Sequence, residues 1–128
     1  VGGDVIYLDC KSLESLVGSP RIVGGEFNCS ITKIGSLEGS PEEVGGDFKC
    51  SNTSIRLLEG APHTVGGNFE CIRTSLISLT GAPKEIGNIF NCYDSIFLES
   101  LDYLPIAKKY FVPDHLKDEL SRILKERG

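Results

Sequence analysis

The chain has 128 residues, of which 40% are hydrophobic, and this length supports one hydrophobic core but not two independent domains. Its 18 acidic and 13 basic side chains give a formal net charge of −5 and form no basic stripe, so we expect no nucleic-acid partner. No apolar run approaches the roughly 20 residues that span a bilayer, and the N-terminus does not resemble a signal peptide, so we expect no membrane partner.

An internal repeat of 21 residues organises residues 1–105, and it predicts about five tandem units. Each Phe-x-Cys segment alternates a large apolar residue, a polar residue and a small apolar residue, which is the period of a half-buried strand. Glycine pairs before these segments and Gly-Ser-Pro or Gly-Ala-Pro groups after them indicate turns. We therefore expect a mostly β solenoid of the leucine-rich-repeat type, with one continuous parallel sheet and an extended return. The residues that recur at this interval are Phe27, Phe48, Phe69 and Phe90, then Cys29, Cys50, Cys71 and Cys92, then Leu37, Leu58 and Leu79.

The first unit departs from this register. Leu13 and Leu16 fit the period, but the segment Val1-Gly2-Gly3 stands one residue early, which indicates an insertion of one residue. We expect the insertion to place Ile6 and Leu8 in the Phe and Cys positions. Val5, Tyr7 and Asp9 should then point to the opposite face of the sheet.

The last unit and the C-terminal segment also differ from the central units. Leu98, Leu101 and Pro105 stand one residue late, which indicates a second insertion. Pro113 and Asp114 open a segment with apolar residues at helical spacing, so residues 106–128 are expected to form a cap containing an amphipathic α-helix. The apolar positions of this helix are Leu116, Leu120, Ile123 and Leu124. The helix should cover the apolar edge that the last repeat leaves.

The unit Phe-x-Cys-x-x-Thr-x-Ile/Leu-x-x-Leu resembles the leucine-rich repeat, with Phe and Cys in two Leu positions and Thr in the Asn position. It is similar to the short repeats of bacterial type III effectors and to repeat arrays encoded by tailed bacteriophages. This resemblance implies a protein-binding module of phage or bacterial origin that acts on a host protein in the cytoplasm. The Asn of the family forms a hydrogen-bonded ladder between turns, so we expect a hydroxyl ladder formed by Thr32, Thr53, Thr74 and Ser95.

The residue types that carry chemistry occur in patterns that favour structural roles. The four repeated cysteines lie one per turn along the solenoid axis, whereas a zinc site needs thiolates that converge on one point. We expect them to be reduced core residues in a reducing compartment, with Cys10 partly exposed. His63 and His115 have no repeated acid or nucleophile near them in sequence. We therefore expect no catalytic residue, no metal, no cofactor and no enzymatic activity.

A partner protein is expected on the concave face of the sheet. If Phe27 and Cys29 face the core, the residues between them face outward, and in the second and third units these are all polar. Ile72, Ile89 and Tyr93 break this polar pattern in later units, rimmed by Glu70 and Asn91, and Tyr7 is the aromatic residue of the same face in the first unit. Exposed apolar and aromatic clusters mark binding sites. Two alternatives remain open: the C-terminal segment folds back over these residues, or Ile89 belongs to an irregular last turn.

A second hypothesis is a structural or assembly protein that associates through its repeat ends. Val1, Val5, Ile6 and Leu8 begin a repeat without a capping helix, and strand hydrogen bonds at this edge are expected to be unpaired. Such an edge favours self-association, or it belongs to a truncated protein.

Overall fold

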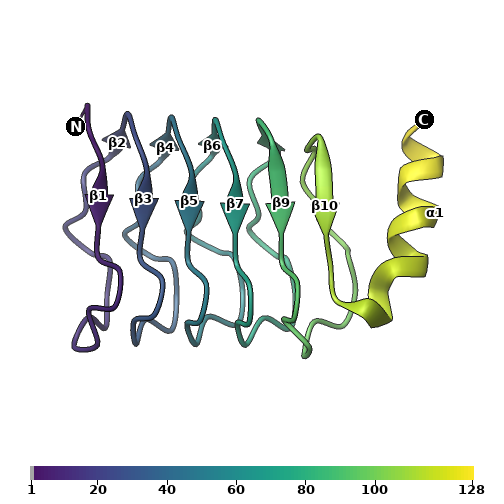
Figure 1. Ribbon diagram of the computed structural model, residues 1–128, viewed down its shortest axis with the longest axis horizontal. Helices are drawn as coiled ribbons and strands as arrows, with labels where there is room; N and C mark the ends of the chain where they lie inside the picture. Colours follow the sequence, from purple (N-terminus) through teal and green to yellow (C-terminus); the bar gives the residue numbers. More distant parts are fainter. Residues whose placement is uncertain (1) are drawn as a thin grey trace.

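The 21-residue interval is the length of one coil in a parallel β-solenoid of about five coils, which confirms the expected fold class. The structure is a computed structural model that describes residues 2–128, and Val1 lies outside the described residues. Figure 1 shows the coils side by side along the long axis of the molecule, with a single helix at the C-terminal end. The coils stack on one another, so each contacts chiefly its neighbours.

Six parallel strands form the sheet that the Phe-x-Cys pattern predicts, and we call it sheet A. They are β1 (Val5–Ile6), β3 (Phe27–Asn28), β5 (Phe48–Lys49), β7 (Phe69–Glu70), β9 (Ile89–Asn91) and β10 (Lys109–Phe111). In the central coils each strand pairs with the strand 21 residues later, as Phe27 does with Phe48.

A second parallel sheet, sheet B, precedes sheet A in each coil and was not expected. Its strands are β2 (Ile22–Val23), β4 (Glu43–Val44), β6 (Thr64–Val65) and β8 (Glu85–Ile86). The prediction of one continuous sheet with an extended return is therefore wrong on this side of the coil. The physical reason is that a β-branched residue precedes each glycine turn and is buried, while the residue before it is exposed.

The core is a set of columns that run along the solenoid axis. The rings of Phe27, Phe48, Phe69 and Phe90 follow one another with centroids 5.5, 5.1 and 5.7 Å apart. Parallel columns of cysteine, leucine and isoleucine side chains are fully buried beside them. Because every coil contributes the same residue types at the same positions, each ring packs on its equivalent in the next coil.

The first coil keeps a different register from the one expected. Val5 pairs with Phe27 and Ile6 with Asn28, so the interval here is 22 residues. The ring of Tyr7 packs edge-on against Phe27 with centroids 5.8 Å apart, while Ile6 is 51% and Leu8 47% exposed. The predicted assignment of the two faces is thus reversed in this coil, and Tyr7 is a core-facing residue. The extra residue is accommodated after the strand, so the Gly3 carbonyl still accepts from the Gly25 N–H.

The hydroxyl column was predicted correctly in its burial but not in its bonding. Thr32, Thr53, Thr74 and Ser95 are all buried. The hydroxyls of Thr32 and Thr53 each donate at 2.8 Å to the cysteine carbonyl three residues earlier in their own coil. Those of Thr74 and Ser95, 2.8 Å apart, do join two coils. The shorter hydroxyl side chain satisfies the local carbonyl first, so a continuous ladder does not form.

The solenoid continues beyond residue 105 before the helix begins. Strand β10 adds a sixth strand to sheet A, with Tyr110 paired to Phe90. A 3-10 turn, η1 (Asp114–Leu116), then leads into α1 (Lys117–Arg127). Leu120 and Ile123 pack against the core, whereas Leu124 is exposed.

The helix covers the end of the last coil, as predicted, and its polar side chains replace the backbone of a following coil. The Glu119 carboxylate accepts from the Leu101 N–H at 2.6 Å. The Arg127 guanidinium donates to the carbonyls of Leu104 and Pro105 at 2.6 and 3.1 Å. These bonds satisfy backbone groups that would otherwise be left unpaired at the end of the array.

Candidate protein-binding face

The outer face of sheet A carries three rows of side chains that point away from the core. Its middle row follows directly from the strand register, because the paired residues lie side by side. In order along the solenoid this row is Ile6, Asn28, Lys49, Glu70, Asn91 and Phe111. The face is therefore apolar at both ends and polar in the middle.

The polar middle of the face is internally paired. Lys49 Nζ lies 3.4 Å from Glu26 Oε2, which also accepts from the Asn28 side-chain amide at 3.2 Å. Partial burial lowers the pKa of Lys49, but the carboxylates of Glu26 and Glu70 outweigh this effect and raise it above its usual value. Lys49 therefore remains charged on this face.

An aromatic cluster occupies the C-terminal part of the face, and it comprises Ile72, Ile89, Tyr93 and Phe111. Tyr93 is 43% and Phe111 39% exposed, while the two isoleucines are half-buried. Lys109 Nζ lies 5.0 Å from the centre of the Phe111 ring, which places a cation beside the cluster. These are the side chains with which a partner could make apolar contact.

A pocket of about 320 Å³ opens beside this cluster, between β10 and the C-terminal helix. Lys117 stands at this pocket with its Nζ 3.0 Å from Asp114 Oδ1, and this hydrogen bond raises the pKa of Lys117 above its usual value. The pocket has aromatic and aliphatic walls and a cation, a combination suited to one apolar side chain from a partner. Its lining residues are Tyr93, Tyr110, Phe111, Val112, Lys117, Leu120 and Ser121.

Five of the six residues predicted to bind a partner are brought together here. Ile72, Ile89 and Tyr93 lie on neighbouring coils, with Glu70 and Asn91 paired in adjacent strands beside them. Ile89 belongs to the regular strand β9, and the helix lies beyond β10 at the end of the sheet without covering Tyr93 (Figure 1). The two alternative interpretations of these residues therefore do not describe the structure.

Tyr7 is the sixth predicted residue, and the structure places it on the core side of the sheet. Sequence reasoning missed Lys109 and Phe111, which complete the face. The signal that could have found them is the alternation of Lys109, Tyr110 and Phe111, with Tyr110 in the core position of the repeat. The interval of 20 residues between β9 and β10 obscured it.

The cysteines do not contribute to an exposed site, apart from Cys10. The four repeated thiols are buried, as predicted, and Cys10 is exposed. Burial raises the pKa of Cys29 and Cys92 to about 12, and that of Cys50 and Cys71 well above its usual value. The buried thiols are therefore neutral, which is unfavourable for nucleophilic attack or metal binding.

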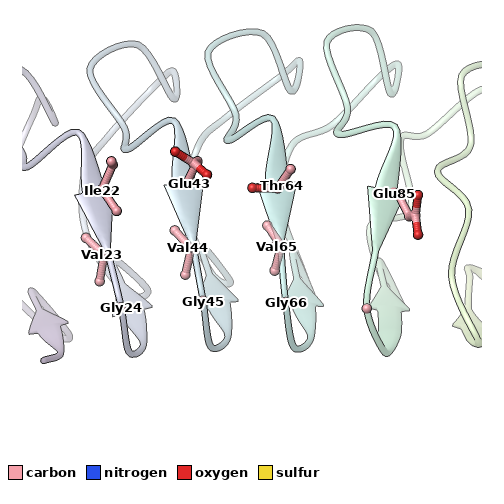
Figure 2. A pocket seen from close by; sticks show the side chains of 11 residues that line it. Ile22, Val23, Gly24, Glu43, Val44, Gly45, Thr64, Val65, Gly66 and Glu85 are labelled. Atoms are coloured by element: carbon pink, nitrogen blue, oxygen red, sulfur yellow. The ribbon is translucent and has the colours of Figure 1, made fainter. Parts of the chain in front are cut away.

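A shallow groove of about 540 Å³ follows sheet B (Figure 2). Exposed side chains of Ile22, Glu43, Thr64 and Glu85 form one row, and glycines leave the adjacent turn without side chains. Glu43 and Glu85 are two coils apart, which corresponds to about 10 Å between backbones. The two carboxylates therefore do not form a close acid pair, and the groove offers no aromatic anchor.

Comparisons with known protein families, curated proteins and solved structures gave no match. Within residues 2–128, no group of three or more His, Cys, Asp or Glu side chains is placed to share a metal ion. The same part of the chain contains no helix with the length and apolar character needed to cross a membrane. The outer face of sheet A is thus assessed from the chemistry of its own residues.

Proposed function

We propose that the chain is a non-enzymatic protein-interaction module whose partner binds on the outer face of sheet A. The observation that supports this most strongly is the aromatic cluster, which stands exposed on a polar sheet beside a pocket that can take one side chain. Clusters of this kind, with polar residues around them, are typical of binding sites. Neutral buried thiols and the spacing of the acidic residues favour binding over catalysis.

The architecture suits this function because the face is formed by regular secondary structure. Six hydrogen-bonded strands, fixed by the stacked core rings beneath them, hold the outward side chains in place before a partner arrives. A preorganised surface loses little conformational entropy on binding. By its resemblance to effector and phage repeats, the chain would act on a host protein inside a cell.

End-to-end association of coils is the weaker candidate. The C-terminal end of the array is covered by α1, and its backbone groups already bond to Glu119 and Arg127. A second copy would have to displace these contacts in order to continue the sheets. The exposed Ile6 and Leu8 on β1 favour contact through the face as well as through the edge.

The test is partner capture from the source lysate with paired variants. Tyr93→Ser and Ile72→Ser should each weaken capture by about 30-fold if these residues are binding hot spots. Phe97→Ser is the matched control, because Phe97 is 62% exposed and lies beyond the turn that ends the face. Equal capture by all three variants, with unchanged melting temperatures, would show that the face does not bind the partner.

A further inference from the structure

The middle row of the outer face of sheet A has a self-complementary order. Read from the first coil it runs apolar, amide, cation, anion, amide, apolar: Ile6, Asn28, Lys49, Glu70, Asn91, Phe111. Read from the last coil, the same row presents an anion where the first reading has a cation. A surface with this property matches a reversed copy of itself.

We infer that this face binds a second copy of the chain, with the two sheets face to face and their coils running in opposite directions. The inference rests on the proposed function and specifies its partner. A two-fold axis parallel to the strands, midway between β5 and β7, would place Lys49 opposite Glu70 of the partner subunit, and the reverse pair forms by symmetry. Asn28 would meet the partner's Asn91, and Ile6 the partner's Phe111.

The row on one side of the middle row supports the same arrangement. It runs Asp4, Glu26, Asp47, Asn68, Ile89, Lys109, because these residues precede the middle-row residues by two in each strand. Reversal brings Asp4 opposite Lys109 of the partner subunit, which adds one ion pair at each end of the interface. Unlike charges opposite one another also select the orientation of the two molecules.

The apolar ends of the face fit each other in shape as well as in character. The exposed Ile6 and Leu8 of one copy would lie over the aromatic cluster of the other. The 320 Å³ pocket beside Phe111 and Tyr93 is large enough for one such aliphatic side chain. Each apolar end would therefore be covered by its counterpart.

The opposite orientation is disfavoured by the same row. If the coils of the two copies ran in the same direction, each strand would face its own equivalent, with Lys49 on Lys49 and Glu70 on Glu70. Like charges in direct opposition cost several kcal/mol in an interface. Six strands spaced by about 4.8 Å give a face of roughly 600 Å² per copy, near the lower end of specific interfaces, so we expect a micromolar dimer.

The experiment is sedimentation velocity over 1–500 μM, with charge-reversal variants of the central pair. Wild type should dimerise, and Lys49→Glu or Glu70→Lys alone should weaken dimerisation at least tenfold. An equimolar mixture of the two variants should form a heterodimer, and the double variant should recover the homodimer. Lys33→Glu is the matched control, because Lys33 is exposed outside this face, and it should dimerise like wild type.

A wild-type protein that stays monomeric at 500 μM would overturn the inference. So would single variants that dimerise as well as wild type while melting at the same temperature, or a mixture that fails to associate. These results leave the proposed function separately testable, since Tyr93→Ser can still abolish capture of another protein by a strictly monomeric chain. Loss of dimerisation in both single variants and its recovery in the mixture support the inference.

Discussion

Replacing Gly60 with alanine should destabilise the fold by about 3 kcal/mol, for two separable reasons. Gly60 has φ of +91°, where an L-residue is strained, and an added Cβ would lie 2.7 Å from the Leu37 carbonyl oxygen and the Glu38 nitrogen. Left-handed backbone costs about 1–2 kcal/mol for a residue with a side chain. The short contact forces the coils apart and weakens nearby bonds such as His63 N–H to the Glu42 carbonyl, now 2.7 Å, at about 1 kcal/mol each.

Two further glycines separate these contributions. Gly18 has φ of +97° but nothing within 4 Å of an added Cβ, so Gly18→Ala should cost only the backbone contribution of about 1–2 kcal/mol. Gly35 also has open space and lies outside the left-handed region, so Gly35→Ala should be neutral or stabilise by up to about 1 kcal/mol. Tyr103, with φ of +69°, replaces this turn glycine in the last coil, which fits a conformation that is strained but accessible.

The assay is urea and thermal unfolding of the three variants, followed by circular dichroism. A loss of 3 kcal/mol in a chain of 128 residues corresponds to a fall in melting temperature of about 11 °C. Equal losses in Gly60→Ala and Gly18→Ala would refute the steric contribution. A large loss in Gly35→Ala would refute the whole account, because that site has neither cause of destabilisation.

Two other predictions follow from single columns of the solenoid. A thiol reagent at pH 8 should modify Cys10 rapidly and the four buried cysteines only on unfolding; four fast-reacting thiols would contradict this. Because burial raises their pKa, the free energy of unfolding should fall as the pH rises above about 9, where the unfolded thiols ionise. Ile31 has φ of +57° in the column where the next coil has Asn52, so Ile31→Asn should raise the free energy of unfolding by about 1 kcal/mol in urea titrations, and a decrease would argue against strain there.

Much of the fold is predictable because the repeat records it many times over. The Phe and Cys columns appear four times at one interval, so a single shared conformation explains them all. Sheet B was missed because each of its strands has two residues, too few for a period to be recognised. The face assignment in the first coil was wrong because one extra residue can be placed before or after a strand, and a shift by one residue reverses the two faces.

The candidate site was predictable where it lies in regular coils and not at the end. Ile72, Ile89 and Tyr93 keep the interval of 21, so their shared face could be inferred from alternation alone. Phe111 required knowledge that β10 pairs with β9 at an interval of 20, which depends on how the chain turns before the cap. The complementary order along the middle row likewise becomes visible once both end registers are known.

The hydrogen bonds of Glu119 and Arg127 make the C-terminal helix a modular end piece. Its contacts go to the last coil, through backbone groups between Leu101 and Pro105, and to Tyr110 in the strand that follows. Central coils could therefore be added or removed upstream without changing what the helix recognises. Such length variants would move the two halves of the outer face relative to each other by about 4.8 Å per coil. Array length would then determine which surfaces remain complementary, even though every coil kept its own fold.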